Sequence, residues 1–234
     1  MNAEVSFSVI GDNGILIDFG NTIDDALNRR VFDLFKQIKQ KKNSFIIDVI
    51  PAYSSIAIFY DLKNVRSKNA DAVSCFENVK LQLQELVKEE MSITVSSIRK
   101  IKIPVCYAEK FALDIKEISV KKSISIDEII NIHTSKFYRV YMIGFLPGFP
   151  YMGEVDDKIA MPRKSLPRIT VPAGSVGIAG KQTGIYPITS PGGWQIIGRT
   201  PFNLFDKEKD QPVLLYPGDE IEFYSITENE FTNY

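Results

Sequence analysis

The residues most able to bind a charged group lie between positions 158 and 205 of this 234-residue chain. This stretch carries six lysines and arginines and no aspartate or glutamate. Ten of the fourteen glycines and seven of the twelve prolines fall nearby, between Gly144 and Gly198. Glycine and proline fix the backbone, and glycine also lets it approach a ligand closely. The combination predicts a rigid surface that faces an anion.

Two arginines of this stretch, Arg163 and Arg168, are the predicted anion contacts. The guanidinium group is planar and can hold a carboxylate or a phosphate through two parallel hydrogen bonds. Pro162 and Pro167 stand directly before them and stiffen the backbone that presents them. Because no acidic residue of the stretch neutralises these charges, we expect both arginines to contact a ligand. A solvated basic face is the alternative interpretation.

The segment GSVGIAGKQT, from Gly174 to Thr183, invites comparison with a phosphate-binding loop. The Walker pattern, however, needs a glycine where Ser175 stands and a serine or threonine where Gln182 stands. The sequence therefore excludes a P-loop. Two interpretations remain open: a tight β-turn, or a nest of backbone N–H groups that binds an anion without the P-loop fold.

His133 and Ser190 are the candidate catalytic residues. His133 is the single histidine, and its ordinary pKa near neutrality suits a general acid or base, although a structural or capping role at a helix end is the alternative. Ser190 lies in TSPGGW, outside the Gly-x-Ser-x-Gly context of a nucleophile elbow, so a hydrogen-bonding role is favoured.

Five aromatic residues could wall a pocket or belong to the core. They are Phe145, Phe149, Tyr151, Tyr186 and Trp194.

The elements that must position these residues fall into two predicted domains. The first covers residues 1–92 and reads strand, strand, helix, strand, strand, helix, which is typical of a small α+β domain. Its expected strands are 5–10, 15–19, 45–50 and 56–60, its first helix opens with a cap at Thr22, and its second helix runs near 72–89.

The second predicted domain covers residues 93–234. An extended segment over 92–105 crosses into it, and two short helices follow over 112–120 and 126–134, the second opened by a capping box at Ser125. After Phe137, short strands with frequent glycine and proline turns predict a barrel or a sandwich.

Composition excludes several classes of protein. A net charge of −1 argues against a general nucleic-acid binder, and no apolar run is long enough to span a membrane. The N-terminal residues lack the pattern of a signal peptide. Two cysteines and one histidine are too few for a Cys/His zinc cluster, so no metal site is predicted. We expect a soluble, cytoplasmic protein that binds neither nucleic acid nor membrane.

Several segments make the sequence similar to a known family. They are GFLPGFPYMG, PRITVPAGSVGIAGKQTGIYPITSPGGW and IGRTPFNLFD, preceded by GDNGILIDFG and VIPAYSSIAIFYD and followed by YPGDEIEF. In this order they resemble the allophanate hydrolase subunit 1 family, also called the sporulation kinase A inhibitor family, over almost the whole chain. The resemblance implies a small α+β domain followed by a cyclophilin-like β-barrel.

The resemblance also implies a function. The family includes the B-type subunit of the bacterial ATP-dependent 5-oxoprolinase, which opens 5-oxoproline to glutamate while hydrolysing ATP. The implied partners are a homologous cyclophilin-like protein, the C-type subunit, and a barrel-type protein, the A-type subunit. The implied cosubstrate of the complex is ATP, together with Mg²⁺, and no tightly bound cofactor is expected in this chain. Alternatives within the family are half of a biotin-dependent carboxyltransferase of the urea carboxylase kind, and an inhibitor that docks on a sporulation-type histidine kinase.

The family's motif positions supply the predicted site, which we expect at or near the interface with the partner protein. The predicted catalytic residues are His133 and Ser190. The predicted substrate-binding or anion-binding residues are Arg163, Arg168, Gly174, Gly177, Gln182, Tyr186, Gly192, Gly193 and Trp194. Lys181 departs from the pattern, because many members carry a smaller residue there.

Overall fold

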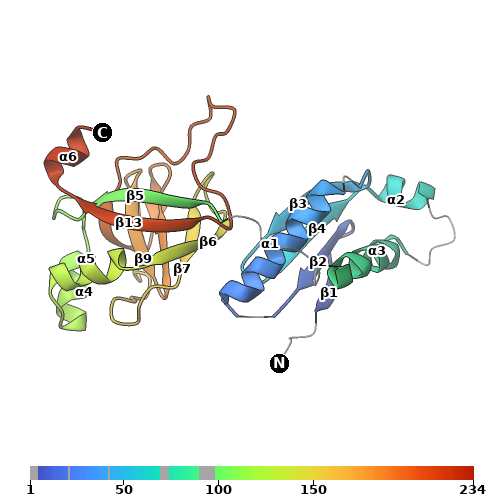
Figure 1. Ribbon diagram of the computed structural model, residues 1–234, viewed down its shortest axis with the longest axis horizontal. Helices are drawn as coiled ribbons and strands as arrows, with labels where there is room; N and C mark the ends of the chain where they lie inside the picture. Colours follow the sequence, from blue (N-terminus) through green and yellow to red (C-terminus); the bar gives the residue numbers. More distant parts are fainter. Residues whose placement is uncertain (1–4, 21, 42, 69–73, 90–97) are drawn as a thin grey trace. The chain divides into compact units, whose positions relative to one another are not determined.

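The computed structural model describes residues 5–20, 22–41, 43–68, 74–89 and 98–234. The chain divides into two compact units, residues 1–97 and 98–234 (Figure 1). The expected domain boundary at 92/93 lies outside the described residues. The first unit is an α+β unit and the second contains a closed β-barrel, which confirms the predicted fold class.

The first unit is a four-stranded antiparallel sheet with helices against one face (Figure 1). The strand order is β1-β2-β4-β3. Alternate residues of the central strands, such as Ile15 and Ile17, are fully buried, and Val31 and Leu34 of α1 pack onto them. Period-two burial facing a 3.6-residue helical stripe is the pattern that the sequence predicts. The strands are β1 Ser6–Ile10, β2 Gly14–Asp18, β3 Ile46–Pro51 and β4 Ser55–Tyr60, and the helices are α1 Asp25–Gln40, α2 Leu62–Lys68 and α3 Cys75–Glu89.

Two details of this unit differ from the prediction. The N-cap of α1 is Asp24, whose side chain accepts a hydrogen bond from the Leu27 N–H at 2.8 Å, so the predicted cap at Thr22 is wrong by two residues. The short helix α2 has no hydrophobic periodicity long enough to predict it. The second long helix is confirmed from Cys75 onward.

The second unit is a closed seven-stranded barrel in the order β10-β7-β6-β13-β5-β12-β9, with β9 paired to β10. Neighbouring strands are antiparallel except β13 and β5, which run parallel. Beside the barrel, β8 and β11 form a separate two-stranded sheet. The barrel strands are β5 Lys100–Cys106, β6 Phe137–Ile143, β7 Pro150–Gly153, β9 Ser175–Ala179, β10 Gln182–Ile185, β12 Gln195–Arg199 and β13 Glu220–Ile226, and the small sheet consists of β8 Arg168–Val171 and β11 Ser190–Gly192.

Three helices belong to the second unit: α4 Ile115–Lys122, α5 Ile126–Thr134 and α6 Glu228–Thr232. The first two were predicted, and the Ser125 hydroxyl accepts from the Glu128 N–H at 3.1 Å as the capping box requires. Helix α6 was not predicted, although Thr227 and Glu230 form a complete capping box. Figure 1 shows α4 and α5 lying together against the barrel.

Two apolar clusters organise the second unit. The larger one fills the barrel with residues such as Ile103, Val140 and Phe223. A smaller one draws Ala179 and Ile196 from β9 and β12 and Val171 from β8, together with buried aromatic rings. The smaller cluster therefore fixes the two-stranded sheet against the barrel wall, and the basic stretch is built on it.

Candidate functional site

The basic stretch is held by one buried carboxylate, Asp114, which directly precedes α4. Its Oδ1 accepts hydrogen bonds from Lys164 Nζ at 2.9 Å and from Arg168 Nη2 at 2.6 Å. Its Oδ2 accepts from the Ile196 N–H at 2.6 Å, and only 2% of the residue is exposed. A buried carboxylate is stable only with such partners. The expectation that no acidic residue neutralises these cations is therefore wrong, because Asp114 comes from outside the stretch.

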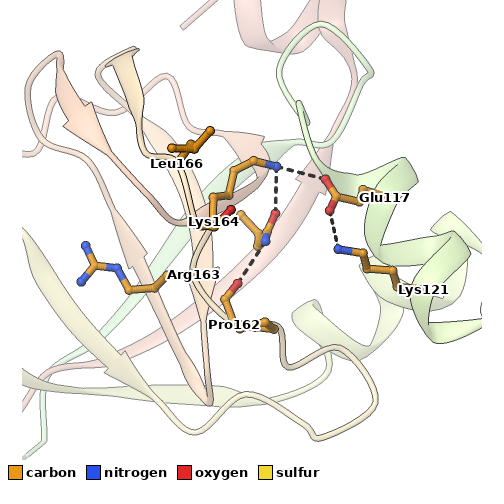
Figure 2. A pocket seen from close by; sticks show the side chains of 8 residues that line it. Glu117, Lys121, Pro162, Arg163, Lys164 and Leu166 are labelled. Atoms are coloured by element: carbon orange, nitrogen blue, oxygen red, sulfur yellow. Dashed lines mark hydrogen bonds and ion pairs between the residues drawn. The ribbon is translucent and has the colours of Figure 1, made fainter.

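Lys164 extends this network to α4 (Figure 2). Its Nζ also reaches Glu117 Oε2 at 3.0 Å, and Lys121 pairs with the other oxygen of Glu117 at 2.6 Å. Hydrogen bonds from Lys121 and Lys164 lower the pKa of Glu117 to about 2. Hydrogen bonding to Asp114 raises the pKa of Lys164. Three cations thus share two carboxylates.

A pocket of about 330 Å³ opens between this network and the loop before β8. Gln195 lies at its edge, where its Nε2 donates to the Pro162 carbonyl at 3.0 Å and fixes the start of the loop. The residues that line the pocket are Glu117, Lys121, Pro162, Arg163, Lys164, Ser165, Leu166 and Gln195. Its size suits a small polar molecule.

Arg163 differs from the other cations of this region. Its side chain is exposed and forms no ion pair or hydrogen bond with any residue that the structure describes. Figure 2 shows its guanidinium group directed away from Lys164 and Glu117. By contrast, Lys181 pairs with Asp157 at 2.9 Å and Arg199 donates to the Ala173 carbonyl at 2.7 Å. Of the six cations, only Arg163 and Lys158 are without a partner among the described residues.

The five aromatic residues divide between core and surface. Phe149 contacts Tyr186 and Trp194 edge-on, with ring centroids 5.2 and 5.3 Å apart, and all three are almost fully buried. Tyr151 is half-buried beside Trp194, whereas 64% of Phe145 is exposed. Burial raises the pKa of Tyr186, and the nearby positive charges of Arg163 and Arg168 oppose that rise. The buried rings form the floor on which the basic loop lies.

The glycines near this aromatic floor, three of them among the predicted site residues, leave space for rings and backbone. A Cβ on Gly192 would overlap the Tyr186 hydroxyl, and one on Gly184 would lie 2.9 Å from the Trp194 ring. A Cβ on Gly177 would lie 3.0 Å from the Trp194 Cβ. Gly174 instead has a left-handed φ of 81° and lies against the Thr200 carbonyl. These glycines are required because rings and backbone occupy the space of their side chains.

The glycine-rich segment is a β-hairpin formed by β9 and β10, with Gln182 opposite Ala179. Three of its N–H groups donate to carbonyl groups of the protein. Gly174 donates to the Tyr186 carbonyl at 2.7 Å, Ser175 to the Pro172 carbonyl at 3.2 Å and Gly180 to the Met161 carbonyl at 2.6 Å. The structure therefore shows the turn that was one of the two interpretations, and these three bonds argue against the nest.

His133 is in the interior of the barrel unit, where none of its surface is exposed. Thr183 donates its proton to the Gly177 carbonyl, so its oxygen accepts from His133 Nε2 at 3.2 Å, and Nδ1 accepts from the Tyr107 hydroxyl at 2.8 Å. Burial lowers the pKa of His133 to about 3. The residue therefore does not titrate near neutrality, which removes the basis of its predicted acid–base role.

Ser190 begins β11, and its hydroxyl donates to the Pro191 carbonyl at 3.1 Å. Its partner is unrelated to those of His133, so the described residues contain no serine–histidine hydrogen bond between the two. The structure thus brings together Arg168, Tyr186, Gly192 and Trp194, places Arg163 beside them, and leaves His133 in a separate core.

Three further residues of the candidate site, Asp114, Glu117 and Gln195, are not among the residues that the sequence predicts. Asp114 stands before a helix and so gives the signal of a cap, but its side chain makes no capping hydrogen bond. Its partners Lys164 and Arg168 are 50 and 54 residues away, a separation that no local pattern reveals.

Among the described residues, no group of three metal-binding side chains occurs, and no helix is long and apolar enough to cross a membrane.

Comparison with known proteins places this chain among sequence and structural relatives. The family model "carboxyltransferase domain, subdomain C and D" matches residues 5–215. The B-type subunit of the 5-oxoprolinase of Bacillus subtilis (strain 168) is 40% identical over 235 residues, which cover 100% of this chain and 98% of that protein. Its counterpart from Escherichia coli O157:H7 is 35% identical over 92% of this chain and 93% of its own length. The crystal structure of TTHA0988 superposes with a TM-score of 0.78 at 31% identity, and covers 91% of this chain but only 40% of that longer chain.

Proposed function

The chain belongs to the carboxyltransferase subdomain C and D family, and we propose that it acts as the B-type subunit of an ATP-dependent 5-oxoprolinase. The observation that carries this proposal is the similarity to the B-type subunit of 5-oxoprolinase at 40% identity over the full length of both chains. This similarity covers both structural units, so it does not come from a single domain that many proteins share. The family resemblance found in the sequence is confirmed by the same comparison.

The reaction explains why the complex needs ATP. An unstrained lactam resists hydrolysis at neutral pH, because its carbonyl is a poor electrophile. Transfer of a phosphoryl group to the amide oxygen makes the ring carbon electrophilic, so that water can add there and the carbon–nitrogen bond can break. The ring nitrogen takes up a proton, phosphate leaves, and the product is glutamate. Positive groups fixed near the substrate stabilise the anionic charge of such a reaction.

This chain supplies binding groups for that reaction, and we infer that its partner proteins complete the site. Asp114 fixes Arg168 and Lys164, and the loop that they hold presents Arg163 to solvent. The expected partners are the homologous cyclophilin-like protein of the C type and the barrel-type protein of the A type, with MgATP as cosubstrate and the cytoplasm as the setting. The match to TTHA0988 supports a larger assembly, because this chain corresponds to 40% of that chain.

The test is the ATPase activity of the co-purified complex of the three proteins. Phosphate release should depend on 5-oxoproline, and each phosphate should be accompanied by one glutamate. A mixture that lacks this chain is the control and should be inactive. Equal phosphate release with and without 5-oxoproline would contradict the proposal.

Half of a biotin-dependent carboxyltransferase is the second candidate, because the matching family model describes a carboxyltransferase domain. It predicts activity only in the presence of a biotinylated carrier protein. Adding avidin separates the two candidates, since avidin should abolish carboxyl transfer and leave a 5-oxoprolinase unaffected.

A further inference from the structure

The anion that this chain can bind is limited by the donors that remain unused. Lys121, Lys164 and Arg168 each contact Asp114 or Glu117, and Lys181 contacts Asp157. In the part of the chain that the structure describes, Arg163 is the unpaired cation beside the pocket. One guanidinium offers two parallel donors, which is the arrangement that a single carboxylate accepts.

A polyphosphate needs more than one such group. Phosphate sites in nucleotide-binding proteins combine a lysine with a series of free backbone N–H groups. Here Lys181 has a carboxylate partner, and the N–H groups of Gly174, Ser175 and Gly180 donate to protein carbonyls. In the segment that most resembles a phosphate loop, the lysine and three of the backbone N–H groups are therefore already bonded within the chain.

One further donor without an acceptor lies near Arg163, on the side chain of Arg168. Arg168 is paired with Gly192 across the small antiparallel sheet, and paired residues direct their side chains to the same face. The Cβ position of Gly192 points at the Tyr186 hydroxyl, so Arg168 and Tyr186 share that face. Arg168 Nη1 is buried without a hydrogen-bond partner.

The Tyr186 hydroxyl lies beside this unused donor, and it carries a hydroxyl proton of its own. The backbone N–H of Trp194 donates to this hydroxyl. Buried donors are almost always satisfied. The unused Nη1 donor of Arg168 therefore indicates that an acceptor from outside the chain binds beside Tyr186.

We propose that this chain binds the carboxylate of a monoanionic substrate through Arg163, and that the nucleotide phosphates are bound elsewhere in the complex. The inference rests on the proposed function for the identity of that substrate, 5-oxoproline. According to this proposal, this chain binds the acid and a partner protein binds MgATP. Arg163 then determines specificity for an acid over a neutral analogue.

Steady-state kinetics of the assembled complex test this division. Arg163→Ala should raise the KM for 5-oxoproline by about 10- to 100-fold, the range expected from loss of a charge-assisted hydrogen bond. The KM for MgATP should change less than about twofold, because the phosphates are bound elsewhere. Arg163→Lys should recover part of the loss, because it restores the charge without the planar fork. Lys158→Ala is the matched control, since it removes an exposed, unpaired charge of the same stretch, and it should change neither constant.

A neutral analogue sharpens the test. The wild-type complex should prefer 5-oxoproline to its carboxamide, and Arg163→Ala should bring the ratio of the two kcat/KM values close to one. A KM for MgATP that rises as much as that for 5-oxoproline, or unchanged constants for both, would overturn the inference.

A binding measurement separates this inference from the proposed function. If the complex shows no 5-oxoproline-dependent ATPase activity, the proposed function fails. Calorimetric titration of the full chain with 5-oxoproline, its carboxamide and MgATP then decides the inference. Binding of the acid alone, lost in Arg163→Ala, upholds it. Binding of MgATP that is lost in Arg163→Ala, or no binding of the acid, contradicts it.

Discussion

At the scale of single residues, the buried carboxylate of Asp114 decides where the cations of the site stand. It is shared by Lys164 and Arg168, and it also ties the loop to β12 through the Ile196 N–H. Removing one partner of a buried ion pair leaves the others charged and unpaired, which is costly. The positive residues around the pocket are therefore a fixed structure and not a loose basic surface.

Replacement of Asp114 should destabilise the second unit strongly. Asp114→Asn should lower its free energy of unfolding by about 3–5 kcal/mol, because Lys164 and Arg168 lose a buried counter-charge. Trp194, the single tryptophan, reports on this unit by fluorescence during urea unfolding. Asp157→Asn, which removes an exposed partner of Lys181, is the control and should cost less than about 1 kcal/mol. Equal effects of the two changes would contradict the account.

His133 should make the second unit sensitive to acid. Burial lowers its folded-state pKa to about 3 from the ordinary 6.5. The folded state therefore favours neutral imidazole, and the resulting stability is complete above pH 6.5 and is lost as the pH falls toward 3. This loss should amount to up to about 1.4 kcal/mol per pH unit within that window.

The variant His133→Gln isolates this contribution. Glutamine stays neutral at every pH and keeps a donor and an acceptor for Thr183 and Tyr107. Urea unfolding at about pH 7 and about pH 4, on either side of the ordinary histidine pKa, should show a smaller loss of stability in the variant than in the wild type. The same loss in both proteins would show that the buried histidine is not responsible.

At the scale of helices and strands, the packing of β11 on the aromatic floor is the most demanding contact. Gly192→Ala should lower the free energy of unfolding by roughly 1–3 kcal/mol, because its methyl group would overlap the Tyr186 hydroxyl. Gly193→Ala is a matched neighbour, since the nearest atom to its Cβ would be 3.6 Å away, and it should have a much smaller effect on the urea midpoint. A larger loss in Gly193→Ala than in Gly192→Ala would be inconsistent with this packing.

Elements with a local signal could be predicted from the sequence, and those without one could not. The periodic burial of α1 and the cap at Ser125 each depend on residues that are only a few positions apart in the sequence. The pairing of Arg168 with Gly192 and with Asp114 depends on chain segments that meet only in the folded barrel. For that reason Arg163 and Arg168 could be selected as site residues by type, whereas the neutralisation of Arg168 could not be foreseen. The interior position of His133 was hidden for the same reason.

At the scale of the whole molecule, the positive and negative charges nearly balance, with a net charge of −1. Around the candidate site they also balance locally. The sequence concentrates six cations between residues 158 and 205, yet Asp114, Glu117 and Asp157 fold back onto three of them, Lys164, Arg168 and Lys181. Among the residues that the structure describes, what remains beside the pocket is one unpaired guanidinium. We propose that this chain recognises a small acid and that its partner proteins bind the triphosphate.

We propose that this chain is the acid-recognising component of a 5-oxoprolinase. The most direct measurement is glutamate formation and phosphate release by the three-protein complex, assembled in parallel with the wild-type chain and with Arg163→Ala. At a 5-oxoproline concentration well below the wild-type KM and at saturating MgATP, we predict coupled release of glutamate and phosphate in the wild type and a rate about 10- to 100-fold lower in the variant. Equal rates with the two chains, or ATP hydrolysis that does not require 5-oxoproline, would contradict the account.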